Sequence, residues 1–305
     1  MLKTPVAIFI FNRPNCTEQL VHALSVVKPA HLFVIADGPR NANDIELCKQ
    51  TRAIIDQIDW PCSIVKRYAT SNIGCRESIP NGLNWVFEQV DACIILEDDC
   101  IPQPSFFPFC QELLSRYKHD ERVMTVGGHR SDGPNELGTE SYYFSKYPSV
   151  WGWATWKEKW AKYDLNMRQW AELKDSKWLD DVLQTSKAVA YWNRMFNHMK
   201  NGLDAWDYAL AYSCWLHNGL SIRSRVNMIS NVGFGKDATH THQTEMADIY
   251  ANPIDIEFPL KHPTAISIDK EMDDRIEWVS FSGMDERRLQ LVRENIIISR
   301  SNKGS

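Results

Sequence analysis

Five short apolar runs alternate with longer segments of helical periodicity over residues 1–130, and this alternation constrains the fold more than any other feature. The runs cover residues 6–11, 32–36, 63–65, 92–96 and 123–126. Unbroken apolar runs are typical of strands that are buried on both faces, and helices of about 10–15 residues between them are typical of crossover connections. The sequence therefore predicts an α/β fold with a mostly parallel central sheet sandwiched by helices.

The composition excludes several classes of function. The chain has 305 residues with a formal net charge of −5, so it offers no basic field that would attract a nucleic acid. No apolar run approaches the roughly 20 residues that span a bilayer, and we expect at most peripheral contact with a membrane. The eight cysteines are scattered without a C-x-x-C pair, which is typical of thiols in a reducing compartment. We therefore expect a reducing compartment.

An acidic triplet follows one of the predicted strands, at the edge where parallel sheets bind ligands. Glu97, Asp98 and Asp99 come directly after the apolar run 92–96. Three adjacent carboxylates repel one another unless a positive charge lies among them. A hard divalent cation is a natural partner because it prefers oxygen ligands. The alternative is a solvated acidic loop in which Asp99 caps the next helix.

Asp37 and Arg13 also follow predicted strands. Asp37 could accept hydrogen bonds from a nucleobase or a ribose, or it could form an Asp-Gly turn. Arg13, together with Arg67 and Arg76 on later loops, could clamp a diphosphate. Each of these arginines taken alone is typical of a surface charge.

Two further groups of residues could carry chemistry. In the segment Asp204-Ala205-Trp206-Asp207 an acid lies beside an aromatic ring, where a raised pKa would suit proton abstraction. A helix cap is the alternative for either acid. His240 and His242 would lie on one face of an extended segment and could bind a metal or a phosphate.

Tryptophans concentrate in the second half of the chain. Nine of the 12 lie between residues 151 and 215, and we interpret the segment 151–220 as a Trp-rich, mostly helical lobe. Such rings either build an aromatic core or stack on the flat faces of sugars. The sequence has no P-loop, dinucleotide-binding, metalloprotease or serine-hydrolase motif, and this disfavours those four classes of enzyme.

The order of these motifs resembles nucleotide-diphospho-sugar transferases of the GT-A fold. Within that class the sequence is most similar to the N-acetylglucosaminyltransferase I-like family and its bacterial relatives, over about residues 4–245. The resemblance rests on Phe11-Asn12-Arg13, Ala36-Asp37, a helix over 76–82, Ile95-Leu96-Glu97-Asp98-Asp99, Val150-Trp151-Gly152-Trp153, Trp206-Asp207 and a loop from Phe234 to His240.

This resemblance implies a role for each matching position on the donor side. Asp37 would read the uracil, Asp98 would bind the ribose, and Glu97 would hydrogen-bond the donor sugar. Asp99 would hold Mn²⁺ or Mg²⁺. The residues that it places around the nucleotide and donor are Phe11, Asn12, Arg13, Asp37, Arg76, Glu97 and Asp98.

On the acceptor side the resemblance implies that Asp207 is the general base. The family usually has two adjacent acids after this tryptophan, whereas here Tyr208 follows Asp207, so Asp204 is an alternative base. His240 or His242 would approach the metal and the diphosphate. The expected acceptor platform consists of Trp151, Trp153 and Trp156.

The implied activity is an inverting, metal-dependent transfer of a sugar, N-acetylglucosamine by family, from a UDP-sugar to a hydroxyl of a glycan or of a lipid-linked or protein-linked acceptor. Residues 1–130 would bind the nucleotide-sugar, 131–245 would bind the acceptor and carry the base, and 246–305 would form a C-terminal extension. We expect a cytoplasmic enzyme, at most at the inner face of a bacterial membrane. Two alternatives stay open, namely a metal-dependent phosphoesterase that uses the acidic triplet and a non-catalytic glycan-binding protein.

Overall fold

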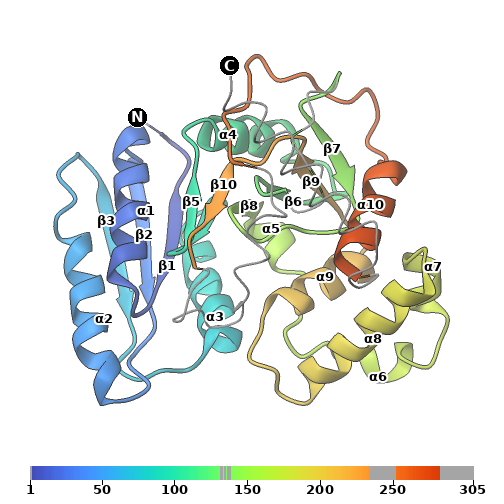
Figure 1. Cartoon of the computed structure of the whole chain (residues 1–305), viewed down its shortest axis with the longest axis horizontal. Helices are drawn as coiled ribbons and strands as arrows, with labels where there is room; N and C mark the ends of the chain where they lie inside the picture. The colour runs from blue at the N-terminus through green and yellow to red at the C-terminus, as the bar shows by residue number, and fades with distance from the viewer. Residues whose placement is uncertain (1, 131–132, 134, 136–138, 234–251, 282–305) are drawn as a thin grey trace, which may run out of the picture.

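A computed structural model of the chain describes residues 2–130, 133, 135, 139–233 and 252–281. At its centre lies an eight-stranded sheet (Figure 1). The strands of this sheet are β1 (Val6–Ile10), β2 (His31–Ala36), β3 (Ser63–Tyr68), β4 (Ala92–Glu97), β6 (Val123–Gly127), β7 (Tyr142–Ser145), β8 (Trp153–Trp156) and β9 (Leu220–Ser224). They lie side by side in the order β3-β2-β1-β4-β8-β6-β9-β7. A separate antiparallel pair consists of β5 (Cys100–Pro102) and β10 (Ile229–Asn231).

Helices connect and cover these strands. They are α1 (Pro14–Val27), α2 (Ala42–Ile55), α3 (Cys75–Phe87), α4 (Phe106–Arg116), α5 (Lys157–Trp160), α6 (Trp170–Leu173), α7 (Trp178–Val182), α8 (Ser186–Lys200), α9 (Asp207–Leu216) and α10 (Lys270–Phe281). The predicted alternation of strands and helices over the first 130 residues is confirmed. In the part of the chain that the structure describes, no helix combines the length and the apolar character that crossing a membrane requires.

Strand β1 illustrates why helices cover both faces of the sheet. Val6, Ile8 and Ile10 belong to one hydrophobic core, and Ala7 and Phe9 belong to the other. Because successive side chains of a strand point to opposite faces, an unbroken apolar run requires cover on both sides. Helices α1, α2 and α4 contribute to the first core, and α3, α8 and α9 contribute to the second.

The sheet is mostly parallel, as predicted. Strand β1 pairs in parallel with β2 and β4, β2 with β3, and β6 with β9. The antiparallel neighbours are β8, between β4 and β6, and β7, beside β9. The carboxyl ends of β1, β2 and β4 therefore meet at one edge, and the α/β fold class with helices on both faces is confirmed.

The expectation for residues 151–220 needs a correction at its start. Trp153–Trp156 form strand β8 in the middle of the sheet and not a helix. The run Trp-Ala-Thr-Trp is aromatic and β-branched, which suits a strand. Trp153 and Trp156 are only 1% and 3% exposed, and each ring lies in the core on one face of the sheet. Because no face of either ring is open, the predicted role of these two residues in an acceptor platform is wrong.

Helix α10 ties the sheet to the tryptophan-rich lobe. The buried Glu277 accepts hydrogen bonds from the Tyr147 hydroxyl at 2.7 Å and the Thr185 N–H at 3.1 Å, and it pairs with Lys146 at 3.3 Å. One turn earlier, Asp273 accepts a hydrogen bond from the Lys146 N–H at 3.1 Å. Three segments that are distant in sequence therefore share one buried polar network.

We expect Asp273 to make the stability of the fold depend on pH. Burial, only partly offset by hydrogen bonds from Ser145 and Lys146, raises the pKa of this carboxyl to about 6, whereas an unfolded chain has a value of about 3.9. The folded state binds this proton more tightly, so the group favours folding below about pH 4 and loses this contribution as the pH rises to about 6. Relative to Asp273→Asn, the wild-type free energy of unfolding should fall by up to about 1.4 kcal/mol per pH unit across this range. Urea denaturation at several pH values measures this, and equal slopes for the two proteins would contradict it.

Candidate active site

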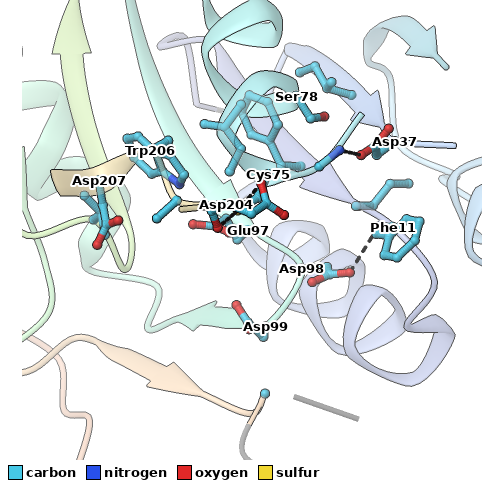
Figure 2. A pocket seen from close by; sticks show the side chains of 18 of the residues that line it. Phe11, Asp37, Cys75, Ser78, Glu97, Asp98, Asp99, Asp204, Trp206 and Asp207 are labelled. Carbon is cyan, nitrogen blue, oxygen red and sulfur yellow. Dashed lines mark hydrogen bonds between the residues drawn. The ribbon is translucent and has the colours of Figure 1, made fainter. Parts of the chain in front are cut away.

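A cavity of about 520 Å³ opens at the carboxyl ends of β1, β2 and β4 (Figure 2). Residues from the start of α3, the loop before β8, helix α8, the loop before α9 and the end of β10 with the residues after it also line the cavity. Open α/β sheets bind their ligands at this edge. The charged residues that line the cavity, among those described, are Arg13, Asp37, Arg40, Glu97, Asp98, Asp99, Asp204 and Asp207.

The acidic triplet at the end of β4 holds the guanidinium of Arg13. Arg13 Nη2 contacts Asp98 Oδ1, and Arg13 Nη1 donates to Asp99 Oδ2 at 2.8 Å. Asp98 is only 1% exposed and also accepts a hydrogen bond from the Phe11 N–H at 3.3 Å (Figure 2). The positive charge that the triplet was expected to need is therefore supplied, in the protein itself, by Arg13.

The triplet still carries more negative than positive charge. Burial, together with the charges of Asp99 and Asp98, raises the pKa of Glu97 to about 8. Burial also raises the pKa of Asp98 to about 6, although the charge of Arg13 acts in the opposite direction. Among the described residues that line the cavity there are six acidic side chains and two guanidinium groups. A ligand that brings a diphosphate into this cavity would require further positive charge.

Asp37 organises the loop that precedes α3. Its carboxylate accepts hydrogen bonds from the backbone N–H groups of Gly38 at 2.8 Å, Ile73 at 3.1 Å and Gly74 at 3.1 Å, and from the Asn72 amide at 2.9 Å. A carboxylate offers about four acceptor positions, so these four donors occupy the positions that a nucleobase would need. The structure favours the turn interpretation of Asp37 over the direct reading of a uracil.

Asp204 and Asp207 reach the cavity from the same loop with different roles. Asp204 Oδ1 accepts a hydrogen bond from the Arg76 N–H at 2.9 Å in the first turn of α3, so Asp204 caps that helix. Gly74 is required beside it, because its φ is +79° and a Cβ there would lie 2.7 Å from Asp204 Oδ1. Asp207 is the first residue of α9 and lies apart from Asp204 and Glu97 in Figure 2. This arrangement favours Asp207 as the base.

Two residues expected near the donor have other partners. Asn12 Nδ2 donates to Asp44 Oδ1 at 2.7 Å, at the start of α2. Arg76 Nη1 donates to the Met199 carbonyl at 3.0 Å, near the end of α8. Neither Asn12 nor Arg76 lines the cavity. The structure brings neither side chain into the cavity: Asn12 links the segment after β1 to α2, and Arg76 links α3 to the end of α8.

Of the three tryptophans expected to form an acceptor platform, the structure brings only Trp151 to the cavity. Trp151 is partly exposed and packs on His129 with ring centroids 4.5 Å apart. Trp206 also lines the cavity, and its ring stacks on that of Trp153 at 5.6 Å. His240 and His242, the other expected metal or phosphate ligands, lie outside the described residues.

Some cavity residues were not identified from the sequence. The Arg40 guanidinium lies 5.0 Å from the centre of the Phe11 ring. In the sequence, the only indication that Arg40 lies at the ligand edge is the Asp-Gly-Pro turn directly before it. The Cys75 thiol donates to a carbonyl of the loop before α9 at 3.0 Å. Gly233 reaches Asp99 because β10 pairs with β5, which starts one residue after Asp99. The last two placements depend on non-local packing that no local pattern indicates.

The side chains of the cavity can bind a divalent cation if the substrate supplies most of the oxygen ligands. Among the described residues, no group of three or more His, Cys, Asp and Glu side chains could hold a metal ion by itself. Magnesium is often bound through one or two carboxylates plus substrate phosphates. The Asp99 side chain is 18% exposed and lines the cavity. Asp99 is therefore a residue that could hold Mn²⁺ or Mg²⁺ if a diphosphate supplied the other oxygens.

No protein-family model matches the chain, and no curated protein matches it. Several solved structures are similar in fold. A UDP-glucose pyrophosphorylase in complex with UDP-glucose is 9% identical with a TM-score of 0.38, and the match covers 72% of this chain and 90% of that one. The apo form of a UDP-glucose pyrophosphorylase is 10% identical with a TM-score of 0.35 and the same coverage. The 4-diphosphocytidyl-2C-methyl-D-erythritol synthase of Anaerococcus prevotii DSM 20548 is 10% identical with a TM-score of 0.34, over 64% of this chain and 96% of that one.

Proposed function

We propose that the protein transfers a sugar from a nucleoside diphosphate sugar, with UDP as the expected nucleotide, to a hydroxyl group of an acceptor. One observation carries this proposal: the same cavity is lined by Asp99, which pairs with Arg13 at 2.8 Å, and by Asp207 and Trp151. A transfer of this kind needs positive charge at the leaving diphosphate and a separate base at the attacking hydroxyl. Asp99 and Asp207 lie well apart in Figure 2, as these two tasks require.

The donor would lie along the carboxyl ends of β1, β2 and β4. The Phe11 ring, with the Arg40 guanidinium 5.0 Å away, offers a flat surface for the nucleobase. Glu97 would face the sugar. A divalent cation held by Asp99 would neutralise the charge that develops on the departing diphosphate. Arg13 would add its own positive charge next to that position.

The acceptor would enter from the side of Trp151, whose ring can stack on a sugar face. Asp207 would take the proton of the acceptor hydroxyl while its oxygen attacks the anomeric carbon. The new glycosidic bond forms as the bond between that carbon and the diphosphate oxygen breaks, and the configuration at the carbon is inverted. The acceptor is a glycan or a lipid-linked or protein-linked hydroxyl in this proposal.

A panel of nucleotide sugars tests the proposal directly. We expect UDP release that requires both an acceptor and Mn²⁺ or Mg²⁺, and that stops when the metal is chelated. Asp99→Asn should weaken the metal-dependent binding of UDP, whereas Asp120→Asn, a change at the surface next to Arg122, should not. Full metal-dependent turnover in Asp99→Asn would contradict the assigned role of Asp99.

The same assay separates the alternatives. Release of inorganic phosphate without sugar transfer would favour a metal-dependent phosphoesterase. Glycan binding with no turnover of any nucleotide sugar would favour a non-catalytic binding protein. Either result would replace the proposed transfer reaction.

A further inference from the structure

The two ion pairs of Arg13 differ in their access to the cavity. The Asp98 side chain is 2% exposed, and its second oxygen is used by the Phe11 N–H. The Asp99 side chain is 18% exposed, and Arg13 Nη1 lies 2.8 Å from its Oδ2. A buried ion pair is costly to break because it leaves an uncompensated charge, whereas a partly exposed pair costs much less. The pair with Asp99 is therefore the one that a competing cation can break.

The backbone holds Arg13 in place while its guanidinium can still adjust. Arg13 is the residue directly before α1, and its carbonyl accepts the Thr17 N–H at 3.1 Å. The side chain remains attached to Asp98 through Nη2. A modest rotation of the planar guanidinium would move Nη1 away from Asp99 without breaking the pair with Asp98.

The surroundings of Asp99 leave little room for two cations on the same oxygen. A Cβ at Gly233 would lie 2.3 Å from Asp99 Oδ2 and 3.0 Å from Arg13 Nη1, so the Gly233 backbone covers this oxygen on another side. A divalent ion at Oδ2 would also repel the guanidinium at short range. Metal binding at this oxygen and the contact with Arg13 Nη1 therefore exclude each other.

We propose that Arg13 is an exchangeable counter-ion for Asp99, which a divalent cation displaces more readily when a diphosphate is present to accept the released Nη1 donor. This inference rests on the proposed function, and it makes metal and nucleotide bind cooperatively. Without nucleotide, Arg13 competes with the metal for Asp99. With nucleotide, the same guanidinium donates to a phosphate oxygen, which suits its planar donor geometry.

Mn²⁺ binding, followed by electron paramagnetic resonance of the free ion without any sugar donor or acceptor, tests this inference. The informative variant is Arg13→Lys, because one ammonium keeps a positive charge at the buried Asp98 but cannot span both carboxylates. We expect Arg13→Lys to bind Mn²⁺ alone about tenfold more tightly than wild type. In the wild type, UDP should tighten Mn²⁺ binding within the range of about 5–150-fold that is typical of coupled sites, and this gain should be smaller in Arg13→Lys.

Arg122→Lys is the matched control. Arg122 also pairs with a carboxylate, Asp120 at 2.8 Å, but it does not line the cavity. Its Mn²⁺ affinity should equal that of the wild type. Mn²⁺ affinity that is unchanged or weaker in Arg13→Lys, with binding still abolished by Asp99→Asn, would overturn the counter-ion role.

Nitrogen-15 resonances of the Arg13 guanidinium provide a second measurement in the wild type, which does not depend on the folding of a variant. They should shift when Mg²⁺ and UDP are added together, and absence of a shift at saturation would also overturn the role. Sugar transfer that proceeds in the absence of any metal would overturn this inference while leaving the transfer reaction itself intact. Cooperative binding of Mn²⁺ and UDP without sugar transfer would overturn the proposed transfer reaction and leave the counter-ion role of Arg13 intact.

Discussion

The Asp207→Asn protein should transfer sugar about 10²–10⁴-fold more slowly than the wild type, with its affinity for the metal–UDP complex unchanged. Asp207 is the first residue of α9 and lines the cavity away from the acidic triplet. An amide has nearly the same size as the carboxylate but cannot accept the proton of the acceptor hydroxyl. Turnover under saturating donor, together with calorimetry of UDP binding in Mn²⁺, separates loss of the base from loss of the donor site.

Asp204→Asn is the matched control for this prediction. The amide oxygen of the new side chain can still accept the Arg76 N–H that Asp204 accepts at 2.9 Å, so the cap of α3 is retained. We expect this variant to keep much more activity than Asp207→Asn. If instead Asp204→Asn showed the large loss of turnover expected for the base, and Asp207→Asn kept most of the wild-type turnover, Asp204 would be the base.

Trp153→Ala should lower the free energy of unfolding by about 3–5 kcal/mol. The Trp153 ring is 1% exposed, stacks on Trp206 at 5.6 Å and lies 6.2 Å from Trp160. Its removal would leave a large cavity under the strand β8 that joins the two parts of the sheet. Urea denaturation monitored by circular dichroism measures the loss.

Trp151→Ala provides the contrast, because Trp151 is two residues away but partly exposed at the cavity. We expect a smaller loss of stability and a higher KM for the acceptor, with the KM for the donor unchanged. Equal destabilisation by the two substitutions would contradict the different burial of the two rings.

The first half of the fold was predictable because its signals are local. Strands such as Val6–Ile10 and Ala92–Glu97 are short apolar runs that need cover on both faces, and such runs are recognisable without knowledge of their neighbours. Strand β8 is not recognisable from the sequence alone, because Trp153–Trp156 lies in a stretch whose tryptophans otherwise belong mainly to helices. Its membership of the sheet depends on antiparallel pairing with β4 and β6, which are about 60 and 30 residues away in sequence.

The candidate site was predictable as a set of residues but not as a set of contacts. Acids at the end of an apolar strand indicate a ligand edge, and this reasoning identified Glu97, Asp98 and Asp99. That Arg13 lies among them follows from the parallel register of β1 and β4, which places Phe9 opposite Glu97. Sequence spacing carries no information on that register. For the same reason, the burial of Trp153 could not be distinguished from the exposure of its neighbour Trp151.

The cap that Asp204 places on α3 also fixes the loop before α9 against the first turn of α3. Residues of the first turn of α3 line the cavity, and the loop that contains Asp204 leads, three residues later, to Asp207, which lines it as well. The hydrogen bond from the Arg76 N–H to Asp204 therefore fixes the spacing between the start of α3 and the start of α9. We expect a change that lengthens this hydrogen bond to make room for a larger group in the proposed donor site without altering Asp99 or Asp207.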